Sequence, residues 1–125
     1  SFEDLISNSD IISFHCKAAK DGKPLITKEH YKKMKPTAYI INAARGNIVD
    51  EKDLNEALNE NLIAGAALDV YSKEPAKENV LFNNPKAILT PHIAASTTEA
   101  SIVVAEMVAN QISDFLLNGV KINTV

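Results

Sequence analysis

The stretch TPHIAAST, residues 90–97, places a histidine between an apolar run and the start of a long helix-like segment. An imidazole titrates near neutral pH, so His92 has the chemistry to give and take a proton. Arg45 carries a planar fork of donors that suits a carboxylate. Glu74 supplies an anion that would favour the protonated form of a neighbouring imidazole. These three residue types together could bind a carboxylate and move a proton beside it.

Each of these side chains also has a structural interpretation. A lone histidine such as His92 is more often packed than catalytic, Arg45 fits a surface turn, and Glu74 fits a solvated loop. His15 and Cys16 are most simply the end of a buried strand. The proposed chemistry therefore depends on whether the fold brings the side chains together.

Four short apolar runs predict the elements that would do so. They are residues 11–14, 38–42, 64–70 and 87–90. Continuous apolar runs of this length are typical of strands buried on both faces of a parallel sheet. Segments of helical character separate the runs at intervals of roughly 25 residues, which favours βαβ units. We therefore expect an α/β fold with a Rossmann-like, doubly wound parallel sheet.

Residue patterns also predict where the helices begin. Thr27 and Asp50 are candidate N-caps, and Ser96 with Glu99 has the spacing of a capping box. The segment after Ser96 carries apolar residues at steps of four and should end before Gly119.

Polar residues follow each predicted strand, at the edge where parallel sheets bind ligands. These are His15 and Cys16, residues 42–47, residues 69–75, and His92. The connection 71–86 has no helical period, so it should be a long loop beside this edge, where function is often found. We therefore expect the functional site at the carboxyl ends of the strands.

The bulk composition narrows the class of protein. The 125 residues are 46% hydrophobic and 23% charged, which indicates a globular domain. The net charge of −3, with scattered basic residues, argues against nucleic-acid or membrane-surface partners. A single cysteine excludes an internal disulfide and argues against a metal site. With no unbroken apolar run of about 18 residues and no leader segment, we expect a cytoplasmic protein without a membrane span.

The segment NAARGNIVDEKDLNEALNENLIAGAALDVYSKEP, followed by ILTPHIAAST, resembles the second half of the nucleotide-binding domain of the D-2-hydroxyacid dehydrogenases. Within the family, KDGKPLITKE and NGVKINTV are most similar to the 3-phosphoglycerate dehydrogenase branch. The resemblance implies that residues 1–125 form the later half of a Rossmann domain. It further implies that the substrate domain and the Gly-rich phosphate loop lie outside the chain.

The resemblance also implies NAD as cofactor, a 2-hydroxy or 2-keto acid as substrate, and a homodimer for the full-length protein. Arg45 would bind the substrate carboxylate, His92 would act as acid/base, and Glu74 would hold the ring of His92. Asp69 would face the nicotinamide carboxamide. The cofactor would be lined by His15, Cys16, Ala43, Ala44, Arg45, Asp69 and His92. Lys17 stands where the family usually has proline, which would alter the shape of that cofactor loop.

Two other functions remain open at this point. One is a non-catalytic scaffold, such as a corepressor-like binding protein, because one fold serves many functions. The other is an interaction module that acts through the long C-terminal helix.

Overall fold

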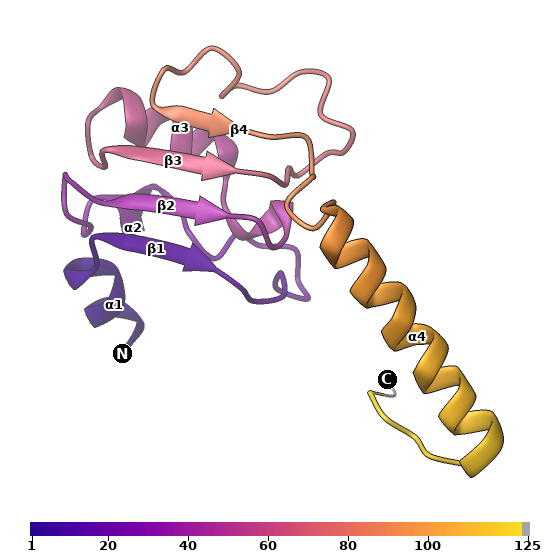
Figure 1. The fold of residues 1–125 in the computed structure, drawn as a ribbon. Coiled ribbons are helices and arrows are strands. Elements are labelled where there is room, and N and C mark those ends of the chain that lie inside the picture. Colours follow the sequence, from indigo (N-terminus) through magenta and orange to yellow (C-terminus); the bar gives the residue numbers. More distant parts are fainter. Residues whose placement is uncertain (124–125) are drawn as a thin grey trace. The chain divides into compact units, whose positions relative to one another are not determined.

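The computed structural model describes residues 1–123 and divides the chain into two compact units, Ser1–His92 and a second that begins at Ile93. The first unit contains a four-stranded sheet. Its strands are β1 (Ile11–Phe14), β2 (Tyr39–Asn42), β3 (Gly65–Leu68) and β4 (Ala87–Leu89). All neighbouring pairs are parallel, in the order β1-β2-β3-β4 (Figure 1). The predicted parallel α/β fold is confirmed.

The register of the strands places every second residue in one core. Ile12 pairs with Ile40, and Ile40 pairs with Ala66, and all three are buried. Side chains from three helices join the same core, including Ile6, Tyr31, Leu54, Ala57 and Leu58. Burial of this apolar surface is the main contribution that holds the sheet to its helices.

The opposite face of the sheet is exposed, so the prediction that the strands are buried on both faces is wrong for this chain. Ile11, Tyr39 and Ile88 lie on that face and are 61%, 50% and 72% exposed. The error has a simple reason. A continuous apolar run predicts two apolar faces, but it does not say which of them another element covers.

Three helices and one 3-10 turn precede β4. They are α1 (Phe2–Asn8), α2 (Lys28–Tyr31), η1 (Gly46–Ile48) and α3 (Glu51–Asn59). Thr27 and Asp50 are the N-cap residues of α2 and α3, as predicted. One oxygen of Asp50 accepts hydrogen bonds from the backbone N–H groups of Lys52 and Asp53, each at 2.9 Å. These bonds fix where α3 begins.

Helix α1 was not predicted. Its signal is short: Ser1 and Asp4 form a capping box, in which the Ser1 hydroxyl accepts the Asp4 N–H at 3.2 Å. The loop prediction for residues 71–86 is confirmed, because that connection contains no helix or strand between β3 and β4. The connection leaves the carboxyl end of β3 and returns to the start of the parallel strand β4 (Figure 1).

The second unit consists mainly of α4 (Thr98–Asn118). Its N-cap is Thr97, whose hydroxyl accepts the Ala100 N–H at 3.0 Å, so the prediction of Ser96 is wrong by one residue. Ser96 instead donates its backbone N–H to the Ile93 carbonyl, which places Ser96 in the preceding turn. The helix ends before Gly119, as predicted, and Gly119 has a φ of 67° that suits a glycine C-cap.

None of the α4 side chains is buried. Its apolar side includes Val104, Val108, Ile112 and Leu116 at steps of four, all of them exposed. By length and composition alone, α4 is long and apolar enough to cross a membrane. Isolated acidic residues interrupt the apolar run, which is why the sequence shows no unbroken apolar run here.

Candidate active site

Segments that follow three neighbouring strands start at one edge of the sheet, because Phe14, Asn42 and Leu68 are paired in register. Beyond this edge is a hollow of about 440 Å³. Its lining consists of Ala18, Arg45, Gly46, Asn47, Val70, Tyr71, Ser72, Glu74 and His92. The fold therefore brings Arg45, Glu74 and His92 to the same hollow, from three separate parts of the sequence.

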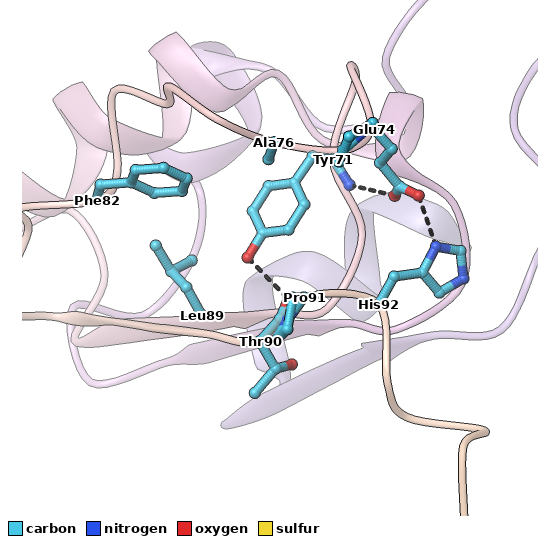
Figure 2. Close-up of a pocket in the computed structure, with 9 residues that line it drawn as sticks. Tyr71, Glu74, Ala76, Phe82, Leu89, Thr90, Pro91 and His92 are labelled. Carbon is cyan, nitrogen blue, oxygen red and sulfur yellow. Dashed lines mark hydrogen bonds and ion pairs between the residues drawn. The ribbon is translucent and has the colours of Figure 1, made fainter.

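Glu74 and His92 form a direct pair. One Glu74 carboxylate oxygen lies 2.6 Å from His92 Nδ1, and the other accepts the Tyr71 backbone N–H at 2.9 Å (Figure 2). The hydrogen bond from His92, followed by that from Tyr71, lowers the pKa of Glu74 below its ordinary value. Glu74 is thus an anion at neutral pH. It engages Nδ1 and leaves Nε2 as the nitrogen that can meet a substrate.

The backbone at His92 has a φ of 55°, in the left-handed region that non-glycine residues seldom adopt. The side chain is 54% exposed, so the ring is accessible from solvent. Two residues earlier, the Thr90 carbonyl accepts the Tyr71 hydroxyl at 2.9 Å. Burial raises the pKa of that hydroxyl, so it remains a donor at neutral pH.

Arg45 is exposed and sits at the end of a tight turn after β2. Its Nη1 donates to the Ala44 carbonyl at 2.6 Å. The turn is organised by Asn42, which is fully buried: its amide donates to the Arg45 carbonyl at 2.9 Å and its carbonyl oxygen accepts the Ala44 N–H at 3.2 Å. Sequence reasoning did not assign Asn42 a role. Its signal is an amide at the last, buried position of an apolar strand.

Gly46 allows two loops of the site to approach each other. A Cβ at this position would lie 1.8 Å from the Tyr71 carbonyl oxygen, closer than any real contact. The same loop is held by Glu51, whose carboxylate accepts the Ser72 N–H at 2.7 Å and the Ser72 hydroxyl at 2.9 Å. These contacts fix segment 71–75 beside the turn that carries Arg45.

The remaining predicted residues are placed differently. His15, Cys16 and Ala43 are exposed at the strand ends, while Ala44 is half-buried. His15 Nε2 pairs with the Ser13 hydroxyl at 2.8 Å. Asp69 is buried and accepts the Thr90 hydroxyl. None of these five residues lines the 440 Å³ hollow. Ala18 and Tyr71, to which sequence reasoning assigned no role, do line it.

A second hollow of about 520 Å³ lies on the other side of segment 71–75. Figure 2 shows its mainly apolar lining: Tyr71, Glu74, Pro75, Ala76, Phe82, Leu89, Thr90, Pro91 and His92. The Glu74–His92 pair borders both hollows, whereas Arg45 lines only the 440 Å³ one. A carboxylate that reaches both Arg45 and the ring of His92 would therefore lie in the 440 Å³ hollow.

Comparison with known proteins finds dehydrogenases and reductases that match nearly the whole chain. The D-3-phosphoglycerate dehydrogenase of Bacillus subtilis is 44% identical over 115 residues, which cover 92% of this chain and 22% of the relative. A glyoxylate reductase structure from Paecilomyes thermophila matches with a TM-score of 0.88 and 35% identity, over 98% of this chain and 37% of that one. A Lactobacillus jensenii D-lactate dehydrogenase structure with NAD⁺ has a TM-score of 0.84 and 31% identity, over 100% and 42%.

The chain thus spans well under half the length of each of these proteins. Residues 1–94 match the family model for the NAD-binding domain of the D-isomer specific 2-hydroxyacid dehydrogenases. The match covers most of the chain and includes both strands and loops of the site. The chain belongs to this NAD-binding domain family.

Proposed function

We propose that this chain is the later half of the nucleotide-binding domain of an NAD-dependent dehydrogenase that interconverts a 2-hydroxy acid and a 2-keto acid. The observation that carries the proposal is the Glu74–His92 pair, 2.6 Å apart, on a hollow that Arg45 also lines. A scaffold protein on the same fold would not require an acid, an imidazole and a guanidinium at one exposed hollow.

Each side chain has a distinct task in keto-acid reduction. Arg45 binds the substrate carboxylate through its forked donors, with one of them already oriented by the Ala44 carbonyl. His92 gives a proton from Nε2 to the keto oxygen as that oxygen becomes a hydroxyl. Glu74, held as an anion, stabilises the protonated ring and fixes its orientation. In the oxidation direction the same nitrogen takes the proton back.

The residues at the strand ends fit the nicotinamide side of NAD, which supplies or accepts the hydride when it is bound. Ala43 and Ala44 leave the edge of the sheet open because their side chains are small. The buried Asp69 carboxylate has the acceptor chemistry that a carboxamide N–H requires. We assign His15 and Cys16 to the same lining because they follow the neighbouring strand.

Within this reaction class, we propose 3-phosphoglycerate as the substrate. The B. subtilis relative is named for that substrate, and its 44% identity extends over 92% of this chain. Glyoxylate and lactate are the competing substrates, because similar structures carry those names. Assaying the full-length protein against 3-phosphoglycerate, glyoxylate and D-lactate would rank the three. A kcat/KM that is highest for glyoxylate or D-lactate would overturn the substrate but not the reaction class.

The catalytic role of His92 is tested by His92→Gln in the full-length protein. Glutamine can still hydrogen-bond the substrate oxygen, but it does not titrate near neutral pH. Loss of a positioned general acid should lower kcat by about 10²–10⁴-fold. NADH affinity should stay near the parent value, because the assigned cofactor contacts lie mainly on other strand ends.

A purely structural His92 predicts the opposite result. The variant would then have a lower melting temperature but a nearly normal kcat at low temperature. Measuring kcat, NADH affinity and Tm on one preparation separates these outcomes. A near-normal kcat would contradict the catalytic assignment and would favour a binding protein on a dehydrogenase fold.

A further inference from the structure

Tyr71 hydrogen-bonds Glu74 and also the backbone of Thr90, two residues before His92. Its backbone N–H donates to one oxygen of the Glu74 carboxylate at 2.9 Å, while its hydroxyl donates to the Thr90 carbonyl at 2.9 Å. Figure 2 shows the Tyr71 ring between these two segments, beside the pair. One residue therefore connects the loop that carries the acid with the strand end that carries the imidazole.

The packing of the Tyr71 ring does not require its hydroxyl. The ring packs edge-on against Phe82, with centroids 6.4 Å apart, and a phenyl ring would make that contact equally well. The hydroxyl, in contrast, donates to the Thr90 carbonyl, two residues before His92, at 2.9 Å, and has the Leu68 carbonyl as a second, longer acceptor at 3.5 Å. The hydrogen bond thus acts on the backbone that sets the direction of the imidazole.

The backbone around His92 needs this support. With a φ of 55°, His92 occupies a sparsely populated region that persists only where surrounding contacts impose it. Thr90 is held from three sides: its N–H donates to the Leu68 carbonyl at 3.0 Å, its hydroxyl donates to Asp69, and its carbonyl accepts from Tyr71. Of these three contacts, only the last comes from the loop that also holds Glu74.

We infer that Tyr71 is a positioning residue that sets the distance between Glu74 and His92, an inference that rests on the proposed dehydrogenase function. It fixes the carboxylate through its N–H and the imidazole-bearing backbone through its hydroxyl. We assign Tyr71 no part in transferring the proton or in binding the substrate carboxylate, although it lines the 440 Å³ hollow. It acts through the geometry of the pair.

The test is Tyr71→Phe in the full-length protein. This change keeps the ring and the N–H but removes the hydrogen bond to the Thr90 carbonyl. We expect kcat for keto-acid reduction to fall roughly 3–10-fold, the loss that one net hydrogen bond typically produces. The KM for the keto acid should stay within about twofold, because Arg45 still binds the carboxylate.

Two further variants separate positioning from folding. In a Glu74→Ala background the pair is absent, so Tyr71→Phe should cost less than about twofold in kcat there. Tyr31→Phe is the matched control, because Tyr31 is fully buried and its hydroxyl has no hydrogen-bond partner within residues 1–123. That variant should retain the parent kcat and KM.

The outcomes distinguish this inference from the proposed function. A normal kcat in Tyr71→Phe, or an equal loss with and without Glu74, would overturn the positioning role while a damaging His92→Gln still supported the dehydrogenase. A harmless His92→Gln would instead overturn the function itself. A loss in Tyr71→Phe that depends on Glu74 would establish the positioning role.

Discussion

At the residue scale, the site depends on which atoms of the ionisable groups are already engaged. Glu74 uses both carboxylate oxygens, one toward His92 and one toward the Tyr71 N–H. Arg45 uses Nη1 on a backbone carbonyl, which turns the rest of its fork toward solvent. These contacts leave two groups that can bind an incoming keto acid: the remaining guanidinium donors of Arg45 and His92 Nε2.

Arg45→Lys should impair keto-acid reduction by the full-length protein, if the proposed function is right, although the charge is kept. A lysine is a point charge and cannot form two parallel hydrogen bonds to a carboxylate. We expect a loss in kcat/KM of about 30-fold, equivalent to about 2 kcal/mol, as for a charge-assisted contact. Steady-state kinetics checks this. An unchanged kcat/KM would remove Arg45 from the site.

Glu74→Gln should move the pH profile of keto-acid reduction toward lower pH. The lowered pKa of Glu74 means that its anionic form faces the ring throughout the neutral range. Reduction requires the protonated ring, and Glu74→Gln removes the anion that favours the protonated form, so the active range should shift in the acid direction. The profile of kcat/KM against pH reports the shift. A profile that does not move would show that Glu74 and the ring are uncoupled.

At the scale of the elements, the site depends on loops that touch rather than on the strands themselves. The turn after β2 and the loop after β3 meet at Gly46, and Glu51 at the start of α3 binds Ser72 in that loop. Asp50 fixes the start of α3 and therefore the position of Glu51. The cap of α3 thus helps to position loop 71–75 of the candidate site, through the side chain of Glu51.

Gly46→Ala should disrupt this arrangement. The new Cβ would lie 1.8 Å from the Tyr71 carbonyl oxygen and 2.7 Å from the Ser72 nitrogen, so loop 71–75 must move. Overpacking of this kind costs about 1–3 kcal/mol in stability. We expect a lower Tm together with a loss of kcat.

Gly22→Ala is the matched control. Its Cβ would meet no atom within 4 Å, although its φ of 73° disfavours alanine. The control should therefore lose stability, by about 1 kcal/mol, and keep its activity. Equal activity in the two variants would show that the approach of the loops does not matter for catalysis.

At the scale of the whole molecule, the chain exposes apolar surface on two separate parts. One is the open face of the sheet, where Ile11 and Ile88 are 61% and 72% exposed, and β1 and β4 form its edges. The other is α4, with no buried side chain. Exposed apolar surface of this kind favours association with other protein.

The isolated 125-residue chain should therefore self-associate, bind NAD weakly and lack dehydrogenase activity. It contains no G-x-G-x-x-G motif. That motif forms the turn before the helix whose N-terminus usually binds the pyrophosphate of a dinucleotide. Light scattering, calorimetry with NAD and a dehydrogenase assay on the same sample test the three parts. Micromolar NAD affinity in a monomeric sample would contradict the prediction. Replacing Ile11 and Ile88 by lysine should reduce any association that the sheet face causes.

The oligomeric state and the cellular location of the full-length protein stay predictions. A homodimer for the full-length protein is testable by size-exclusion chromatography with light scattering. The cytoplasmic location, without a membrane span, is testable by fractionation. That experiment also decides whether α4, which meets the length and composition of a spanning helix, associates with a membrane.

The sequence by itself determined the class of fold and where along the chain the candidate site lies. The strand β1 has the bounds that the apolar run 11–14 predicts, and β2, β3 and β4 lie within the predicted runs. The polar residues after each strand follow from the same pattern, because parallel strands end at one edge. Arg45, Glu74 and His92 were found in this way, together with a family resemblance that the comparison confirms.

Only the tertiary structure decided how those residues are held. The contacts of Asn42 with its turn, of Gly46 with Tyr71 and of Tyr71 with Thr90 each involve a backbone carbonyl of another residue. Backbone carbonyls are the same in every residue, so the sequence does not say which of them a side chain will meet. The open face of the sheet was equally hidden, because an apolar side chain has the same letter whether it is covered or exposed. Periodicity predicts that a surface will be buried, but only packing determines what buries it.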